Sequence, residues 1–241
     1  MRRIAILIIH GFAGGIYDQE DLANSLELIS KFDVYSFTLP GHDKYILNNI
    51  TKEDWMKAAE NKVELLIKNG YKKIYVVGHS MGGVIATSLA FKYKEIKKIV
   101  LAAPAFEYIF SDKSLNGFKN SIKQGVSVLK RFTGIKEILS RILRVPKKTV
   151  KEFRSLIDNH QEEIKKIDIP ILIIHGTNDD IVPYRSSIKI FDKIPSSKKK
   201  LLLVKGLSHR VFRDIKQEEI IYETIEFLNK ENKKMNIKKK I

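Results

Sequence analysis

Short, continuous apolar runs recur along this chain of 241 residues. They are rich in Ile, Val and Leu, and they do not alternate apolar with polar positions. Runs of this kind are typical of strands that helices cover on both faces, which is the environment of a parallel sheet. We therefore predict six strands, over residues 4–9, 34–37, 73–77, 98–102, 171–174 and 200–204.

The segments between these runs show helical periodicity, with apolar side chains returning every three or four positions. The clearest case begins at Thr51, where Asp54 completes a capping-box pattern ahead of an apolar side. Helices are predicted over residues 21–30, 51–67, 80–93, 185–192 and 214–229. The alternation of strands and helices predicts a doubly wound α/β fold with about six parallel strands and right-handed crossovers.

The alternation stops between residues 105 and 166, where several short amphipathic helices follow the fourth predicted strand. An insertion at the carboxyl end of a strand lies over the crevice where such sheets bind ligands, so we predict a small helical cap, or lid. The alternative is an ordinary crossover helix with a long loop. The expected domains are an α/β core of residues 1–104 and 167–230, a cap of residues 105–166, and a basic, frayed tail of residues 231–241.

The net charge of +16 raises the question of a nucleic-acid partner. Lys supplies most of this charge, it is scattered along the helices, and no nucleic-acid-binding motif occurs, so no such partner is expected. The absence of cysteine excludes disulfides and cysteine nucleophiles. The apolar stretch within the first ten residues is shorter than the hydrophobic region of a signal peptide. No apolar run in the sequence is long enough to span a membrane. A cytoplasmic location is expected.

The pentapeptide G-H-S-M-G, residues 78–82, lies between a predicted strand and a predicted helix. A serine at such a turn presents its hydroxyl at the sheet edge, and the strained backbone requires small neighbours, which Gly78, Gly82 and Gly83 provide. The string alone also occurs by chance as a glycine-rich turn. Its place between a strand and a helix predicts a nucleophile elbow, with Ser80 as the nucleophile.

A serine nucleophile needs a base, and the base needs an acid that orients it. Of the six histidines, only His209 follows the candidate acids and lies just past the last predicted strand, so we predict that it is the base. Asp179 and Asp180 are both candidates for the acid, and Asp179 is preferred because Asp180 suits a turn or capping position. His10 is interpreted as a structural residue that bonds local backbone.

A tetrahedral intermediate needs donors that are already directed at its oxyanion. We predict the backbone N–H of Met81, the residue after the nucleophile, and that of Phe12 in the H-G-F-A-G-G loop. This loop lacks the G-x-G-x-x-G spacing of a dinucleotide site. No pattern typical of metal ligands occurs, so neither a cofactor nor a metal ion is expected.

Taken together, the segments H-G-F-A-G-G, P-G-H, G-H-S-M-G-G, H-G-T-N-D-D-I-V-P and G-L-S-H resemble the α/β-hydrolase superfamily, in particular its bacterial carboxylesterase and monoacylglycerol lipase branch. The resemblance covers nearly the whole chain and weakens in the cap and tail. It implies Ser80, Asp179 and His209 as a catalytic triad, Phe12 and Met81 as oxyanion donors, and a cap over an acyl pocket. The sequence departs from the family pattern at its first residues, where the initial strands of the family are missing.

The resemblance implies a serine carboxylic-ester hydrolase that uses an acyl-enzyme on small hydrophobic substrates, either short- to medium-chain esters or monoacylglycerols. Alternatives on the same fold are a thioesterase, a lipase proper, a peptidase or a non-catalytic ligand-binding protein. The cap is rich in basic residues, which suggests weak association with anionic membrane surfaces, although a solvated basic face is the simpler interpretation.

Overall fold

A seven-stranded parallel sheet forms the centre of the protein, with the strand order β2-β1-β3-β4-β5-β6-β7. The computed structural model describes residues 4–42, 49–107, 145–179, 181–231 and 235–241. The strands are β1 (Ile4–Ile9), β2 (Phe32–Ser36), β3 (Ile74–His79), β4 (Ile96–Ala102), β5 (Ile171–Gly176), β6 (Lys198–Val204) and β7 (Met235–Lys240). The predicted parallel α/β-hydrolase sheet is confirmed, with one more strand than expected.

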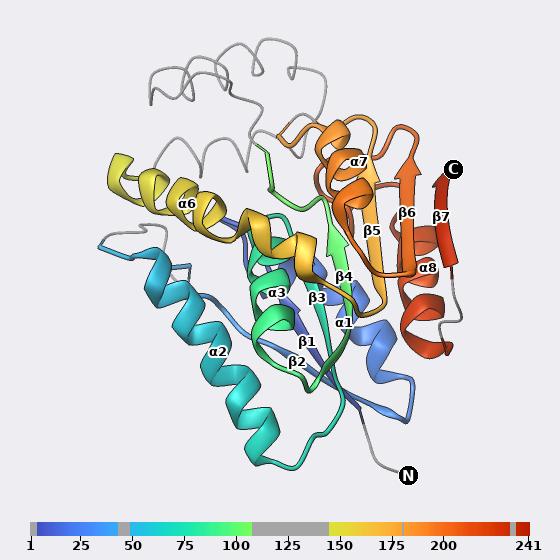
Figure 1. The fold of residues 1–241 in the computed structure, drawn as a ribbon, viewed down its shortest axis with the longest axis horizontal. Helices are drawn as coiled ribbons and strands as arrows, with labels where there is room; N and C mark the ends of the chain where they lie inside the picture. The colour runs from blue at the N-terminus through green and yellow to red at the C-terminus, as the bar shows by residue number, and fades with distance from the viewer. Residues whose placement is uncertain (1–3, 43–48, 108–144, 180, 232–234) are drawn as a thin grey trace.

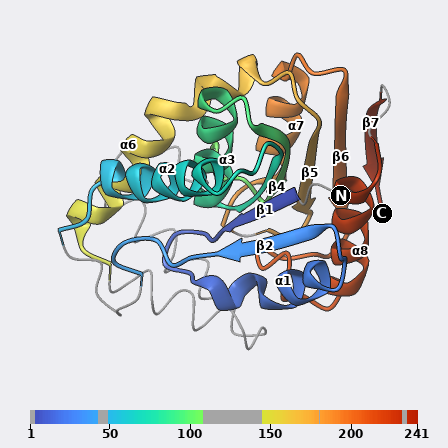
Figure 2. The same ribbon diagram turned by 90° about the horizontal axis from the view of Figure 1, so that it is seen from below.

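Helices cover both faces of this sheet, as the continuous apolar strands require. The helices are η1 (Ile16–Gln19), α1 (Glu20–Glu27), α2 (Lys52–Lys68), α3 (Met81–Lys92), α6 (Lys147–His160), η3 (Gln161–Lys166), α7 (Tyr184–Lys193) and α8 (Gln217–Asn229), where η marks a 3₁₀ helix. Figure 1 shows them around the sheet, and in Figure 2 α1 and α8 lie on the side opposite α2, α3 and α6.

Two apolar cores lie between these layers, one on each face of the sheet. Alternate strand residues point to opposite faces, so neighbours such as Leu7 and Ile8 of β1 enter different cores. The larger core packs the strands against α2, α3, α6 and α7, and it encloses Trp55, which is fully buried. The other core packs them against α1 and α8. Inner strands such as β1 and β5 therefore need apolar side chains on both faces, which explains their unbroken runs.

Local sequence signals determine where several helices begin. The hydroxyl of Thr51 accepts a hydrogen bond from the backbone N–H of Asp54 at 3.3 Å, and the Asp54 carboxylate accepts one from the backbone N–H of Thr51 at 2.9 Å. This is the reciprocal capping box predicted from the sequence, and it satisfies donors at the amino end of α2.

The end of the chain differs from the expected frayed tail. Within the predicted tail 231–241, residues 235–240 form β7 and pair in parallel with β6, from Lys198 opposite Met235 to Leu203 opposite Lys240. Met235 and Ile241 also pack against the core next to α8. A composition rich in Lys and Asn predicted solvent exposure, but ladder hydrogen bonds use only backbone groups. An exposed strand edge is therefore available to such a segment.

The predicted cap lies partly outside the described residues, which omit 108–144. Within the described part, α6 follows this segment and packs against α2 and α3. Its buried side includes Phe153, Leu156 and Ile157, which gives it the amphipathic character expected of helices in this region. The division into core and cap remains a prediction.

Candidate active site

Ser80 lies in a strained turn between the end of β3 and the start of α3. Its φ of 53° and ψ of −115° are unusual for a residue with a side chain. The turn requires close backbone approaches: a Cβ at Gly78 would lie 2.2 Å from the carbonyl oxygen of Gly82, and a Cβ at Gly82 would lie 2.2 Å from that of Ile9. The two glycines of G-H-S-M-G are therefore required by space at this elbow.

The loop after β1 lies directly against the elbow. A Cβ at Gly11 would be 3.0 Å from the Cβ of Ser80 and 3.0 Å from Nδ1 of His79, so a side chain here would crowd the elbow. The carbonyl oxygen of Gly11 accepts hydrogen bonds from His10 Nδ1 at 2.8 Å and from the N–H of Gly14 at 3.1 Å. In a trans peptide, C=O and N–H point in opposite directions, so the N–H of Phe12 is directed away from these partners.

His10 also ties this loop to a second one. Its Nε2 accepts a hydrogen bond from the N–H of Leu39 at 3.0 Å, while Nδ1 donates to Gly11. Burial lowers the pKa of His10, which keeps the ring neutral in this role. These contacts agree with the structural role predicted for His10.

Met81 supplies the other backbone N–H of interest. It is the first residue of α3, and the first N–H groups of a helix have no partner within the helix. The same helix end carries a partial positive charge, which favours an anion beside it. Both backbone donors predicted for an oxyanion, those of Met81 and Phe12, thus belong to segments that contact Ser80.

Asp179 and His209 meet at the carboxyl edge of the sheet, after β5 and β6. The Nδ1 of His209 lies 2.7 Å from Asp179 Oδ2. The Asp179 side chain is fully buried, and His209 is 7% exposed. Asp180, the alternative acid, lies outside the described residues.

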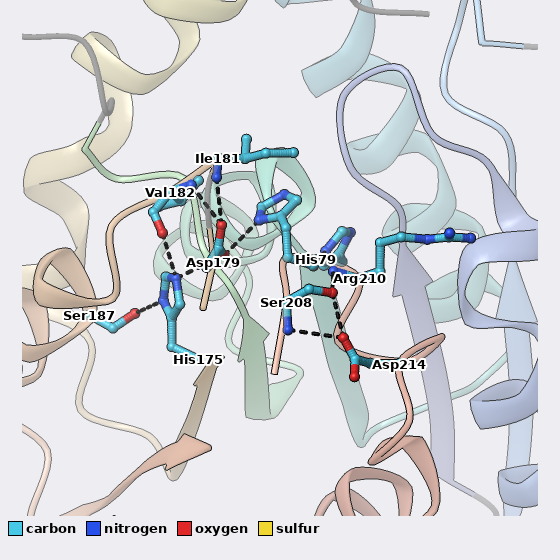
Figure 3. Close-up of polar contacts among 10 residues, drawn as sticks. His79, His175, Asp179, Ile181, Val182, Ser187, Ser208, Arg210 and Asp214 are labelled. Carbon is cyan, nitrogen blue, oxygen red and sulfur yellow. Dashed lines mark hydrogen bonds and ion pairs between the residues drawn. The ribbon is translucent and has the colours of Figure 1, made fainter. Parts of the chain in front are cut away.

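The Asp179 carboxylate is surrounded by donors (Figure 3). Its Oδ1 accepts from the backbone N–H groups of Ile181 at 2.9 Å and Val182 at 2.8 Å, and its Oδ2 lies 3.0 Å from His175 Nε2 as well as 2.7 Å from His209 Nδ1. Burial alone would raise the pKa of Asp179. The nearby charge of His209 and the hydrogen bonds from His175 and His209 outweigh it and hold the pKa below its ordinary value.

A second contact links His209 to the elbow. His79, next to Ser80, donates from Nε2 to the carbonyl oxygen of His209 at 2.8 Å, and the two imidazole rings lie 4.9 Å apart. Burial and the charge of His209 lower the pKa of His79 to about 4. His79 is therefore neutral near pH 7 and acts as a donor to the loop that carries His209.

The loop of His209 is also ordered from its far side. The Asp214 carboxylate accepts hydrogen bonds from the backbone N–H of Ser208 at 2.9 Å and from its hydroxyl (Figure 3). The residue before His209 is thereby held in place.

Sequence reasoning missed the roles of His79 and His175. The available signal for His175 was its position four residues before Asp179, directly after a buried strand. The carbonyl partner of His79 was not readable because a distant loop places it, and the contact of His175 with Asp179 depends on how the turn between them folds.

An aromatic cluster lies beside the loop of Phe12. The Phe12 ring stacks on Phe153 of α6, with ring centroids 4.6 Å apart and an angle of 10° between the planes. Trp55 of α2 meets Phe12 edge-on at 5.8 Å. Two helices thus pack against the residue whose N–H is a predicted oxyanion donor.

Among the residues that the structure describes, no group of His, Asp and Glu side chains could hold a metal ion. Within the same residues, no helix has the length and apolar character needed to cross a membrane.

The arrangement brings a strained serine, an ordered imidazole and a buried carboxylate to one edge of a parallel sheet. With Nδ1 of His209 protonated and bonded to Asp179, the lone pair of the neutral ring lies on Nε2, where it can accept a proton. Fold and elbow define an α/β hydrolase.

The chain belongs to the Hydrolase_4 family (serine aminopeptidase, S33), which matches residues 2–216. It is 25% identical over 234 residues to a carboxylesterase of Bacillus subtilis, covering 94% of this chain and 92% of the relative. It is also 25% identical over 234 residues to a thermostable monoacylglycerol lipase of a Bacillus species, covering 94% and 91%. The crystal structure of the Paleococcus ferrophilus monoacylglycerol lipase has the same fold, with a TM-score of 0.71, 21% identity and 93% of each chain covered.

Proposed function

We propose that this protein is a serine carboxylic-ester hydrolase that acts through an acyl-enzyme on short- to medium-chain esters or monoacylglycerols. Ser80 is the nucleophile, His209 the general base and Asp179 the acid that orients it. The observation that carries the proposal is the 2.7 Å contact between His209 and Asp179, on a loop that His79 ties to the elbow of Ser80.

In the acylation step, Nε2 of His209 removes the hydroxyl proton of Ser80 as Oγ attacks the ester carbonyl carbon. The N–H groups of Phe12 and Met81 stabilise the oxyanion of the tetrahedral intermediate, and Asp179 stabilises the imidazolium. Collapse of the intermediate breaks the bond to the alcohol oxygen. The alcohol takes the proton from His209 and leaves an acyl group on Ser80.

Water completes the cycle. His209 removes a proton from a water molecule that attacks the acyl carbon, a second oxyanion forms against the same donors, and Ser80 leaves with the proton that His209 returns. Every proton transfer in this scheme uses one imidazole, which explains why its orientation by Asp179 matters.

The choice of esters is supported by relatives in the same family that are named as a carboxylesterase and a monoacylglycerol lipase. Aromatic side chains next to the Phe12 loop also suit an apolar acyl group. The triad alone does not choose among esters, thioesters and amides, since substrate choice depends on the pocket around it.

The first test is Ser80→Ala assayed on p-nitrophenyl esters. We expect a loss on the order of 10⁶ in kcat, as for other triad serines. A fluorophosphonate probe should label the parent protein and fail to label the variant. Undiminished hydrolysis by Ser80→Ala would refute the proposal.

The second test defines the substrate. A panel of p-nitrophenyl esters and monoacylglycerols graded by acyl length is compared with p-nitroanilides and thioesters of the same acyl groups. We expect the highest kcat/KM for oxygen esters. A preference for anilides with a free α-amino group would instead indicate a peptidase, and a preference for thioesters a thioesterase.

Weak association with anionic membrane surfaces is a separate part of the proposal. Lys147, Lys148 and Lys151 are exposed on α6, and the net charge of the chain is +16. The protein is expected to sediment with vesicles that contain phosphatidylserine and not with neutral vesicles, and salt should release it. Binding that ignores both vesicle charge and salt would contradict this part alone.

A further inference from the structure

His175, at the end of β5, is a completely buried histidine outside the set of residues assigned to the reaction above. Its Nδ1 lies 2.6 Å from the hydroxyl oxygen of Ser187 on α7. Its Nε2 lies 3.0 Å from the carbonyl oxygen of Val182 and 3.0 Å from Asp179 Oδ2. Figure 3 shows the ring between Ser187 on one side and Asp179 with Val182 on the other.

These partners determine which nitrogen carries the proton. The carbonyl oxygen of Val182 and the carboxylate of Asp179 can only accept, so the proton of His175 lies on Nε2, which donates to Val182 and faces Asp179 Oδ2 at 3.0 Å, where its hydrogen bond lowers the pKa of Asp179. In the neutral ring, Nδ1 is then an acceptor, and the Ser187 hydroxyl donates to it. Ser187 is itself completely buried, so this hydroxyl has a defined partner in place of water.

Both carboxylate oxygens of Asp179 therefore face hydrogen-bond donors whose positions are fixed by the protein. The two N–H groups of Ile181 and Val182 hold Oδ1, and Oδ2 is shared between the two imidazoles of His175 and His209. Because the carboxylate has no exposed surface, no solvent molecule replaces a lost donor without a rearrangement.

We infer that His175, itself oriented by Ser187, is a positioning residue that directs Oδ2 of Asp179 at Nδ1 of His209. The inference rests on the proposed function, because it assigns a task to His175 only if Asp179 and His209 act as acid and base. His175 acts through Asp179 and touches no reacting atom.

This role has an electrostatic consequence. A donor on a carboxylate stabilises its negative charge and lowers its affinity for protons. Without the hydrogen bond from His175, Asp179 attracts the imidazolium of His209 more strongly, so the proton leaves His209 at higher pH. Among the described residues, the charged or titratable groups around this pair include His79, which contacts His209, Asp18, whose charge acts on His79, Asp214, which accepts from Ser208, and Arg210, the residue after His209.

Two substitutions at one position separate the two hydrogen bonds. In His175→Gln, the amide nitrogen takes the place of Nε2 and keeps the donor to Asp179. In His175→Asn, the amide reaches only the place of Nδ1 and keeps the contact with Ser187. Ser187→Ala removes the support of the ring and leaves His175 unchanged.

The measurement is the pH dependence of kcat/KM for a p-nitrophenyl ester, with KM determined separately and folding checked by circular dichroism. For His175→Asn we expect kcat to fall by about tenfold to a hundredfold, by analogy with the loss when the hydrogen-bond partner behind a metal ligand is removed. KM should stay near the parent value, and the acid limb of the profile should move to higher pH. His175→Gln should retain most of kcat and the parent profile.

If His175→Asn does not fold, the same kinetics of Ser187→Ala test the inference. It should lower kcat less than His175→Asn does and move the acid limb in the same direction. The inference is overturned if the acid limb and kcat of His175→Asn and Ser187→Ala match those of the parent, or if His175→Gln loses as much activity as His175→Asn. Failure of the proposed function itself would show separately, as continued hydrolysis by Ser80→Ala.

Discussion

His79 donates a hydrogen bond from Nε2 to the main-chain carbonyl oxygen of His209 at 2.8 Å, across 130 positions of the sequence. The donor belongs to the elbow that ends β3, and the acceptor belongs to the loop after β6. The bond therefore sets the position of the loop that carries the proposed base relative to the proposed nucleophile. His79 occupies the variable second position of the G-x-S-x-G motif, and here it fixes the loop of His209.

Replacing His79 tests this task. His79→Leu removes the donor and should lower kcat about tenfold, since a buried carbonyl left without its partner costs about 1–3 kcal/mol and its loop shifts to recover that loss. His79→Gln places an amide N–H near the original Nε2 and should keep most of the activity. Both are measured as kcat and KM on one ester. Equal activity in the Leu and Gln variants would show that the hydrogen bond has no such role.

The free energy of unfolding should fall as the pH falls from about 6.5 to about 4. Burial lowers the pKa of His10, and burial with the charge of His209 lowers that of His79 from 6.5 to about 4. In this window the unfolded chain binds more protons than the folded chain, so acid favours unfolding. The contribution of His79 is on the order of 3 kcal/mol, because its pKa moves from 6.5 to about 4.

Urea unfolding at several pH values checks this dependence, with His79→Gln as the matched control because it keeps His10 and Asp179. The control should lose less stability over the same window. Asp179 acts at lower pH: its folded pKa lies below the ordinary value of 3.8, so its stabilisation is present above that value and is lost as the pH falls further. A His79→Gln profile parallel to that of the parent would contradict the assigned contribution.

Gly82→Ala should disrupt the elbow. Its added Cβ would lie 2.2 Å from the carbonyl oxygen of Ile9, a backbone atom at the end of β1 that cannot move without its strand. We expect a loss of about 3 kcal/mol or more in the free energy of unfolding, with loss of fluorophosphonate labelling. Gly83→Ala is the control, because its Cβ would meet the side-chain Cβ of Pro104 at 2.9 Å. It should cost less, and a larger cost at Gly83 would contradict this account.

His10 offers a test of the oxyanion loop. His10→Leu removes the donor to the carbonyl oxygen of Gly11, which orients the peptide whose N–H belongs to Phe12. We expect kcat to fall about tenfold or more with little change in KM, because the oxyanion forms after substrate binds. His10→Asn keeps a donor near Nδ1 and should retain more activity.

Steady-state kinetics on one ester, with thermal unfolding to confirm a folded protein, decides between the two His10 variants. A rise in KM with unchanged kcat in His10→Leu would indicate that the loop acts in substrate binding and not in stabilising the oxyanion.

Much of the fold was predictable because its determinants are local. The runs in β1, β3 and β5 identify strands buried on both faces, and Thr51 with Asp54 marks the start of α2. The strand β7 was not predictable from composition. Its pairing depends on the open edge of β6, which exists only in the assembled sheet.

The candidate site divides in the same way. The sequence by itself determined the elbow around Ser80, because its glycines allow the close backbone approaches of this turn. It also determined that Ser80, Asp179 and His209 follow three different strands, and parallel strands end at one edge of the sheet. Only the tertiary structure decided that His79 holds the loop of His209 and that His175 shares the Asp179 oxygen with His209. Hydrogen bonds depend on distances of a few tenths of an ångström between loops far apart in the chain, and packing of the whole sheet sets those distances.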